Sequence, residues 1–346
     1  MSLRQRFNQS VIDSWYNPGG GWTLWLKPLS SIFSMLAEYR KHRYLDSVRW
    51  TPPVPVIVVG NITVGGTGKT PVVSALIHLL KEQGYRPGII SRGYGTEHQE
   101  DSVVVTVDSD PAMVGDEPVM LAKLQVPLVV DSDRVRGAKH LCTHFDCDVM
   151  VADDGLQHYN LQRHIELAVL DGQRLLGNGF CLPVGPLREP QSRLNTVDFV
   201  LVNRPETVSC EVYEQRLERS DLICFSLVPS RLRRVSDDHE GAAFSGRVHA
   251  VAGIGNPDRF FSTLKSLGYD VIPHPFADHH GFTAEDLNFE DDLPVIMTEK
   301  DAVKCRSFAG DHHWYLPVTT ELPDELIDSL LQMIEARKPI APDNKG

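Results

Sequence analysis

The chain has 346 residues, of which 42% are hydrophobic and 23% charged, values that exclude a disordered or a collagen-like protein. This length suggests two domains, because one domain usually has about 100–200 residues. The 34 Lys and Arg residues are outnumbered by 46 Asp and Glu residues, which leaves a net charge of −12 with histidines neutral. An acidic chain is a poor candidate for non-specific nucleic-acid binding, and we expect no such partner.

The first 50 residues are basic in this acidic chain, with seven cations against three anions. Helical periodicity begins near Trp22 and places five apolar side chains on one stripe: Trp25, Leu29, Ile32, Leu36 and Tyr39. The apolar stretch, residues 22–36, is too short to cross a membrane, which takes about 20 apolar residues. It also lacks the cleavage site of a signal peptide. The stripe therefore packs either against the protein's own body or into a membrane interface.

A buried strand, a glycine-rich loop and a helix follow one another from residue 54. Val54–Val59 is a continuous apolar run, and the helix pattern starts after Lys69-Thr70. This context predicts a phosphate-binding loop, with Lys69 reaching the β- and γ-phosphates and Thr70 ligating Mg²⁺. The expected nucleotide-binding residues are Thr63, Val64, Gly65, Gly66, Thr67, Gly68, Lys69 and Thr70. Thr63 stands where the usual pattern has glycine.

A second apolar strand ends in two carboxylates. Residues 148–152 lead into Asp153 and Asp154, and ligands of an open parallel sheet bind at the carboxyl ends of its strands. We expect this pair to hold Mg²⁺ or its water, as a Walker B aspartate does.

Alternating elements along the rest of the chain predict the fold class. Further strands are expected at 88–91, 103–107, 127–130, 166–170, 198–202, 248–253 and 294–297, with helices at 115–124, 133–145, 257–267 and 324–337. This order indicates an α/β protein with a doubly wound parallel sheet, like that of P-loop NTPases, and a second, smaller α/β lobe. We expect a membrane-docking segment at 1–50, a nucleotide-binding lobe at 51–175, a linker at 176–190 and the second lobe at 191–346.

The six cysteines are scattered and contain no Cys-x-x-Cys motif: Cys142, Cys147, Cys181, Cys210, Cys224 and Cys305. A disulfide-stapled secreted domain uses cysteines at higher density, so we expect reduced thiols in a cytosolic setting and no zinc site.

Seven motifs together resemble the tetraacyldisaccharide 4′-kinase family of the lipid A pathway in Gram-negative bacteria. They lie at residues 59–71, 91–95 (Ser-Arg-Gly-Tyr-Gly), 115–118 (Gly-Asp-Glu-Pro), 153–158 (Asp-Asp-Gly-Leu-Gln-His), 186–190 (Pro-Leu-Arg-Glu-Pro), 278–280 (Asp-His-His) and 298–304 (Thr-Glu-Lys-Asp-Ala-Val-Lys). The family's phosphate loop departs from the usual pattern in the same way. The resemblance implies ATP-dependent phosphorylation of the 4′-hydroxyl of a tetraacyldisaccharide 1-phosphate, giving lipid IVA. It also implies a peripheral protein on the cytoplasmic face of the inner membrane, docked through its first helix.

The same resemblance implies a role for each site residue. Asp116 is the base for the acceptor hydroxyl, and His279 orients it or shares the proton. Lys69 holds the triphosphate, and Arg188 neutralises charge on the transferred phosphoryl group. The implied metal residues are Thr70, Asp153, Asp154 and Glu189. Tyr94 and Gln157 are implied nucleotide or substrate contacts.

Two other functions share parts of this pattern. A membrane-recruited ATPase switch also combines a Gly-Gly-x-Gly-Lys-Thr loop with an amphipathic helix, but its loop typically carries an extra lysine near the start, where this chain has Val64. A GTP-dependent metallochaperone would need a guanine-reading motif. Thr298-Glu299-Lys300-Asp301 lacks the asparagine and has its lysine out of register. Lipid-dependent consumption of ATP separates the kinase from both.

Overall fold

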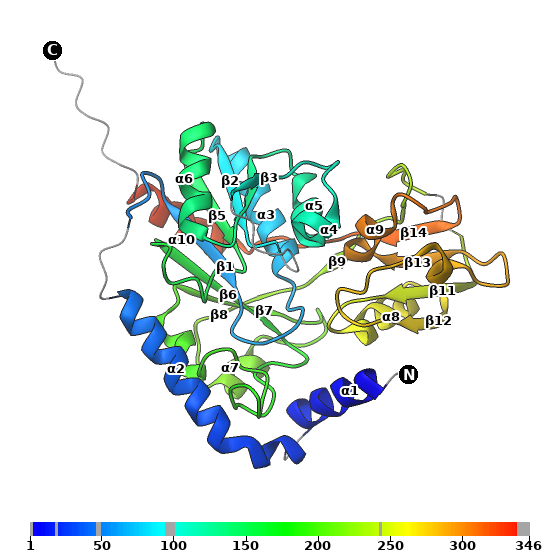
Figure 1. Cartoon of the computed structure of the whole chain (residues 1–346), viewed down its shortest axis with the longest axis horizontal. Helices are drawn as coiled ribbons and strands as arrows, with labels where there is room; N and C mark the ends of the chain where they lie inside the picture. The colour runs from blue at the N-terminus through cyan, green and yellow to red at the C-terminus, as the bar shows by residue number, and fades with distance from the viewer. Residues whose placement is uncertain (1–2, 18–19, 46–49, 94–100, 242–243, 338–346) are drawn as a thin grey trace.

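The computed structural model describes residues 3–17, 20–45, 50–93, 101–241 and 244–337. Its larger lobe contains an eight-stranded sheet in the order β3-β4-β2-β5-β1-β6-β7-β8 (Figure 1), in which only β3 runs antiparallel to its neighbour. The strands are β1 Val56–Gly60, β2 Pro87–Ser91, β3 Val103–Val104, β4 Leu128–Val130, β5 Val149–Asp153, β6 Ile165–Asp171, β7 Phe199–Asn203 and β8 Leu222–Phe225. The central strands are buried throughout, as their apolar runs predict.

Helices cover both faces of this sheet, which confirms the doubly wound fold. One face packs against α3 (Lys69–Glu82), α5 (Asp116–Ala122) and α10 (Asp324–Glu335). The other packs against α6 (Arg134–His144) and α7 (Glu211–Leu217). The short helix α4 (Pro111–Val114) precedes α5, and Gly115 separates them with a φ of 94°. The one helix predicted over 115–124 therefore begins only at Asp116.

The smaller lobe contains a five-stranded sheet in the order β10-β14-β13-β11-β12, with only β10 antiparallel. Its faces pack against α8 (Pro257–Ser266) and α9 (Glu299–Cys305), so it too is an α/β sandwich. A single 3-10 turn, η3 (Ala284–Leu287), lies between β12 and β13. The strands are β10 Arg233–Arg234, β11 Arg247–Ala252, β12 Asp270–Pro275, β13 Val295–Thr298 and β14 His313–Leu316.

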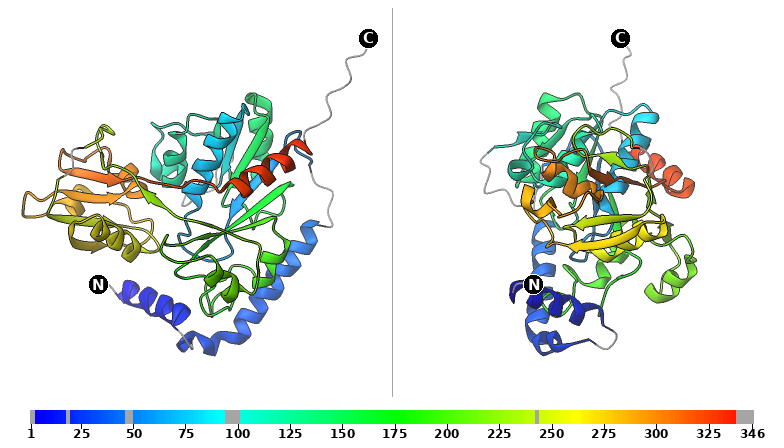
Figure 2. Two further views of the ribbon diagram at one scale, coloured as in Figure 1. Left: turned by 180° about the vertical axis from the view of Figure 1, so that it is seen from behind. Right: turned by 90° about the vertical axis from the view of Figure 1, so that its right-hand side faces the viewer.

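The division between the lobes differs from the expected one, which had a linker at residues 176–190 and the second lobe from residue 191. Strands β7 and β8 extend the first sheet, and residues 175–194 contribute Leu176, Leu187 and Leu194 to its core. The chain enters the smaller lobe through β9 (Val228–Pro229) and returns through β15 (Val318–Thr319), which pair with each other. It then ends in α10, back on the first sheet (Figure 2). Pairing between distant strands, which local patterns do not report, sets this boundary.

The N-terminal segment forms an arm along the outside of the larger lobe, made of α1 (Leu3–Tyr16), the 3-10 turn η1 (Trp22–Leu26) and α2 (Lys27–Leu45) (Figure 1). Small and polar groups attach it to the body. The Ser30 hydroxyl donates to the carbonyl of Cys181 at 2.7 Å, and the Thr23 hydroxyl to that of Val184 at 2.8 Å. Within the described residues, no helix is long and apolar enough to cross a bilayer.

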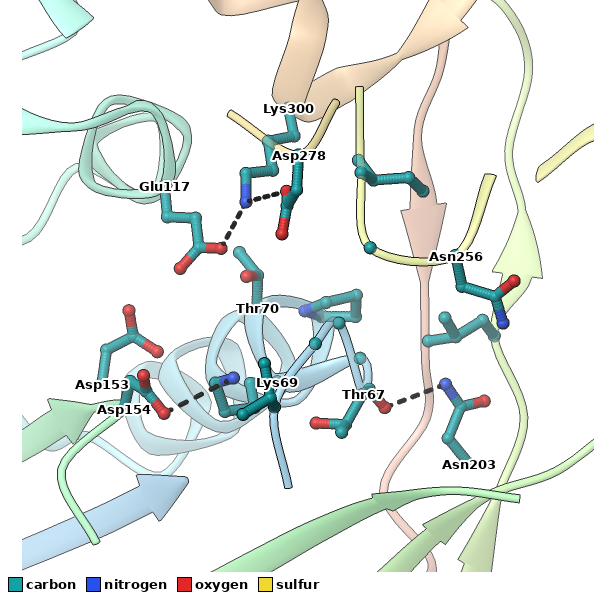
Figure 3. A pocket seen from close by; sticks show the side chains of 18 of the residues that line it. Thr67, Lys69, Thr70, Glu117, Asp153, Asp154, Asn203, Asn256, Asp278 and Lys300 are labelled. Atoms are coloured by element: carbon teal, nitrogen blue, oxygen red, sulfur yellow. Dashed lines mark hydrogen bonds and ion pairs between the residues drawn. The ribbon is translucent and has the colours of Figure 1, made fainter. Parts of the chain in front are cut away.

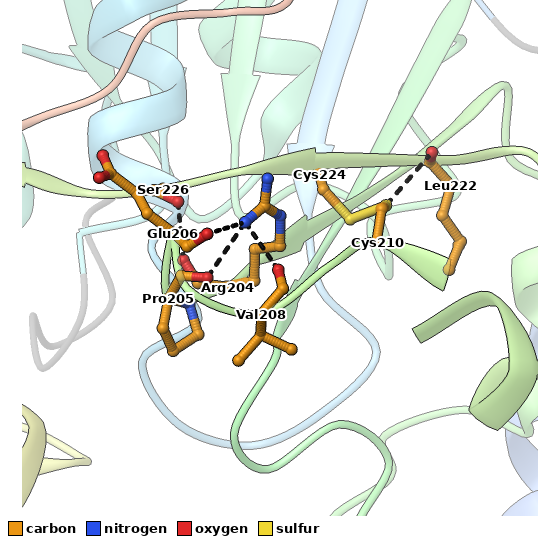
Figure 4. The surroundings of a disulfide bond; sticks show 8 residues. All are labelled: Arg204, Pro205, Glu206, Val208, Cys210, Leu222, Cys224 and Ser226. Atoms are coloured by element: carbon orange, nitrogen blue, oxygen red, sulfur yellow. Dashed lines mark hydrogen bonds between the residues drawn. A yellow bond between two sulfur atoms is a disulfide. The ribbon is translucent and has the colours of Figure 1, made fainter. Parts of the chain in front are cut away.

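A disulfide bond joins Cys210, just before α7, to Cys224 in β8 (Figure 4). The expectation that all cysteines are reduced is therefore wrong for this pair, whereas Cys142, Cys147, Cys181 and Cys305 are free. The Cα atoms of the bonded pair lie 5.9 Å apart because α7 folds back beside the strand that follows it. The bond closes a loop next to residues 204–206, where the Arg204 guanidinium donates to three backbone carbonyls.

Candidate active site

The glycine-rich loop joins the central strand β1 to α3, as expected. Gly65 and Gly68 have φ values of 110° and 93°, a region that glycine adopts without strain. A Cβ atom on Gly68 would also lie 2.6 Å from the amide nitrogen of Asn203. Residues Val64 to Thr70 line a cavity of about 1090 Å³. Thr63, by contrast, is buried and forms an isolated antiparallel β-bridge with Leu187.

Strand register brings the two carboxylates to this loop. Asp153 pairs with Val59, the next-to-last residue of β1, so Asp153 and Asp154 lie beside the phosphate loop. Lys69 Nζ is 3.4 Å from Asp154 Oδ1 (Figure 3). Arg188 Nη1 is 3.1 Å from Asp154 Oδ2. Burial raises the pKa of Asp154, but these two cations outweigh it and hold the pKa well below its usual range.

Asp153 has the opposite electrostatic character. Its burial, together with the nearby charges of Glu117 and Asp154, raises its pKa to about 7. Its Oδ2 atom accepts from the Ser91 hydroxyl at 3.3 Å. Among the described residues, nothing donates a hydrogen bond to Asp153 Oδ1 or pairs with the buried hydroxyl of Thr67.

These atoms fit a magnesium ion. Mg²⁺ prefers oxygen ligands, usually one or two carboxylates together with phosphate oxygens and water. Asp153 Oδ1 is a buried acceptor to which none of the described residues donates, and the Thr70 side chain points into the same cavity (Figure 3). The carboxylate of Glu189, by contrast, is engaged by protein groups: it accepts from Gln157 Nε2 at 2.8 Å and from the Tyr159 hydroxyl.

A carboxylate and an imidazole from different lobes meet at the other side of the cavity. Asp116 begins α5 in the larger lobe, and His279 follows β12 in the smaller one. His279 Nδ1 lies 3.2 Å from Asp116 Oδ2. Burial raises the pKa of Asp116. The hydrogen bond from His279 and the charges of Lys300 and Lys304 lower this pKa by more than burial raises it, so the net shift is downward. Asp116 is therefore ionised at neutral pH.

The cavity also reaches the N-terminal arm. Its lining includes Phe33, Leu36, Ala37 and Arg40 of α2, alongside the phosphate loop and residues of the smaller lobe. One continuous space thus connects a phosphate-binding loop, an Asp–His pair and an apolar helix.

Comparison with known proteins identifies the family. The LpxK family model, described as tetraacyldisaccharide-1-P 4′-kinase, matches residues 22–335. The tetraacyldisaccharide 4′-kinase of Nitrosococcus oceani is 46% identical over 96% of this chain and 97% of its own. That of Alkalilimnicola ehrlichii is 51% identical over 85% and 87%.

This chain belongs to the tetraacyldisaccharide 4′-kinase family. A crystal structure of LpxK from Aquifex aeolicus in complex with ATP superposes with a TM-score of 0.73 and 27% identity, and the match covers 91% of this chain and 98% of that one. The family expected from the seven motifs is confirmed.

The structure places two residues at or next to the site that the sequence pattern did not single out. Arg134 is fully buried and donates to the backbone carbonyls of Asp131 and Asp153. Lys300 lines the cavity between the two lobes. Lys300 belongs to the 298–304 motif that resembles the family, and this motif was the signal that the sequence offered for it. Tyr94 lies outside the described residues.

The other histidine of the Asp-His-His motif has a local role. His280 Nε2 lies 3.2 Å from Asp286, near the smaller lobe's surface. No cluster of three or more metal-ligating His, Cys, Asp or Glu side chains is found in the described part of the chain.

Proposed function

We propose that this protein is the ATP-dependent kinase that phosphorylates the 4′-hydroxyl of a tetraacyldisaccharide 1-phosphate to give lipid IVA. The observation that carries this function is the single cavity that joins the phosphate loop to both the Asp116–His279 pair and the apolar residues of α2. A membrane-recruited ATPase switch also has a phosphate loop and an amphipathic helix, but it has no use for an Asp–His pair that would serve an acceptor hydroxyl.

The phosphate loop and its neighbours hold the triphosphate. Backbone N–H groups of residues 65–68 and the start of α3 bind phosphate oxygens, and Lys69 reaches the β- and γ-phosphates. Asp153 and Thr70 would hold Mg²⁺, which neutralises charge on the phosphates when bound. Asp154 orients Lys69 and Arg188, and Arg188 stabilises the charge on the transferred phosphoryl group. Glu189 supports this shell from the buried network around Tyr159.

Asp116 is the base for the acceptor. The 4′-hydroxyl oxygen forms its bond to the γ-phosphorus while the bond from that phosphorus to the bridging oxygen of ADP breaks, and the hydroxyl proton passes to Asp116. A carboxylate that stays ionised at neutral pH suits this task. His279 orients the carboxylate from the opposite lobe.

The kinase assay uses γ-labelled ATP, Mg²⁺ and tetraacyldisaccharide 1-phosphate in detergent micelles. We expect label in the lipid with the wild type, and a loss of about 100-fold or more with Lys69→Ala and with Asp116→Ala. Lys81→Ala, an exposed lysine on the same helix as Lys69, is the matched control and keeps full activity. Phosphate release without labelled lipid would support the ATPase switch instead.

We also propose that α2 docks on the cytoplasmic face of the inner membrane. All five residues of the apolar stripe are exposed, Trp25 by 89% and Tyr39 by 66%. The opposite side of the helix contacts the body through Ser30 and Phe33. The basic residues Lys27, Arg40 and Arg43 flank the stripe, and anionic lipid headgroups attract such cations. The substrate's acyl chains then enter the cavity where α2 lines it.

Sedimentation with vesicles that contain anionic lipid tests this docking. The double variant Leu29→Asp with Ile32→Asp should remain in the supernatant, because two buried charges oppose insertion of the stripe. The control, Ser31→Asp with His42→Asp, adds the same charge at exposed positions off the stripe and should still sediment. Equal sedimentation of both variants would contradict docking through this face.

A further inference from the structure

Lys300 occupies a place at the centre of the site that the mechanism above does not use. It lies in the first turn of α9 and its side chain is only 16% exposed. Its ammonium is 3.0 Å from Glu117 Oε1 in the larger lobe and 3.6 Å from Asp278 Oδ1 in the smaller one (Figure 3). The same ammonium lies 3.4 Å from Nε2 of His279.

This last contact decides which nitrogen of His279 carries the proton. An ammonium group can only donate hydrogen bonds, so Nε2 must accept and carries no hydrogen. Nδ1 then bears the hydrogen of the neutral ring and donates it to Asp116 Oδ2. The carboxylate of Asp278, which could otherwise accept an Nε2 hydrogen, has its Oδ1 atom 3.9 Å away, beyond hydrogen-bond distance.

We propose that Lys300 is a positioning residue for phosphoryl transfer, which holds His279 as the neutral Nδ1–H tautomer so that His279 donates to Asp116. This proposal rests on the proposed kinase function. A histidine fixed as a donor leaves the remaining lone pairs of the Asp116 carboxylate to accept the proton of the acceptor hydroxyl. The reversed tautomer would point a lone pair at the carboxylate and repel it.

Charged groups of both signs face His279 from the described residues. Asp116 and Glu117 face it from α5, Asp278 from its own loop, and Lys300 and Lys304 from α9. The Lys304 ammonium is 2.8 Å from Asp301 and 3.9 Å from Asp116, so its charge is neutralised mainly by a carboxylate of its own helix. Among the described lysines, Lys300 is the one whose ammonium lies within hydrogen-bond distance of the His279 ring.

The tautomer can be read without any assay of activity. In the full-length protein labelled with nitrogen-15 histidine, His279 signals are assigned by their loss in His279→Asn. We expect the wild type to show the Nδ1–H pattern at neutral pH. Lys300→Met, which removes both donor and charge, should give the Nε2–H form or the imidazolium. Lys300→Gln keeps a donor without charge and should retain more of the wild-type pattern.

Kinetics then show whether Lys300 positions His279 or only helps to hold the two lobes together. We expect Lys300→Met to lower kcat at least about tenfold and to change KM for ATP little. The acid limb of its kcat profile should move to higher pH, because protonation of Asp116 becomes easier without the cation. Lys300→Arg, which keeps donor and charge, should recover much of the rate.

Lys123→Met is the matched control. Lys123, at the end of α5, also bridges the lobes, through Glu299 at 3.2 Å and the Tyr315 hydroxyl at 3.1 Å, and no contact joins it to His279 among those the structure describes. Its loss should leave the acid limb and the tautomer unchanged. A wild-type His279 with its proton on Nε2, or a Lys300→Met enzyme with the kcat and profile of the wild type, would overturn the proposal. Absence of lipid kinase activity with the expected tautomer would instead refute only the proposed function.

Discussion

Adjacent carboxylates acquire opposite properties at the residue scale. Asp154 lies between Lys69 and Arg188 and stays ionised, whereas Asp153 is buried with its Oδ1 atom directed at no donor in the described structure. The sequence Asp-Asp offers no basis for this distinction. Two residues that a motif treats alike therefore have different surroundings: Asp154 pairs with two cations, and Asp153 is the carboxylate that we propose as a Mg²⁺ ligand.

The raised pKa of Asp153, about 7, predicts a pH-dependent affinity for Mg²⁺. The ion binds the carboxylate, so the proton must leave first, and affinity falls as the pH drops through this value. Below it, each pH unit should weaken binding about tenfold. The Mg²⁺ dependence of lipid phosphorylation between pH 6 and 8 measures this effect.

The nucleotide also titrates in this range, because a terminal phosphate has a pKa near 6. Asp153→Asn is therefore the necessary control, since it keeps the nucleotide's contribution and removes that of the carboxyl. Its residual Mg²⁺ dependence should change less with pH than that of the wild type. Identical pH responses in the two proteins would assign the whole effect to the nucleotide.

At the scale of elements, helix α2 has an unusual arrangement. An amphipathic helix on a globular protein ordinarily buries its apolar stripe, but here Ser30 and Phe33 face the body and the stripe faces outward. Periodicity locates the stripe equally well in either case. Only the partners on the other side of the helix decide between a core helix and an interfacial one.

The Cys210–Cys224 bond links two other elements, α7 and β8, and should stabilise the oxidised protein. The bonded residues are 14 apart in sequence, and closing a loop of this size contributes about 3 kcal/mol to the free energy of unfolding. The Cys210→Ser, Cys224→Ser protein should lose about that amount in urea unfolding without reductant. Adding reductant should lower the wild type to the same value and leave the double variant unchanged.

Cys147→Ser, a change at a free cysteine, is the control and should keep the wild-type response to reductant. If the wild-type unfolding curve is the same with and without reductant, the two cysteines are not bonded in solution. The bond closes the loop beside the cavity-lining residues Arg204 and Glu206 (Figure 4). Reducing it therefore also tests whether the bond holds these two residues in place.

At the scale of the whole molecule, the two lobes meet at the phosphate loop. The smaller lobe brings Gly255 against the phosphate loop, where the Arg174 guanidinium donates to its carbonyl at 2.8 Å. A Cβ atom on Gly255 would lie 3.1 Å from the backbone nitrogen of Gly66 and 3.3 Å from the Cα atom of Gly65. The closed arrangement therefore has no room for a side chain at this point.

Gly255→Val should wedge the lobes apart and weaken ATP binding. Overpacking of this kind costs about 1–3 kcal/mol, which corresponds to about a tenfold loss of affinity or more. Gly281→Val, in another loop of the same lobe with open space around its Cα, should bind ATP normally. Calorimetric titration with ATP compares the two, and equal affinities would show that closure is not needed to hold the nucleotide.

The sequence by itself determined the features that are local in the chain. The strand, loop and helix around Lys69, the carboxylates at the end of β5 and the apolar stripe of α2 each occupy a short segment, and their chemistry follows from residue type and spacing. The motifs were enough to identify the family. The core elements of the first sheet as far as β7 were expected within a few residues of their observed bounds.

Tertiary structure alone decided what depends on residues far apart in the chain. Strands β7 and β8 join the first sheet, and α10 returns to it after the whole smaller lobe has been formed. The same long-range packing bonds Cys210 to Cys224, turns the stripe of α2 outward and sets Lys300 against His279. Local patterns report the preferences of neighbouring residues, whereas these contacts arise only when strand pairing and burial of two separate cores bring distant segments together.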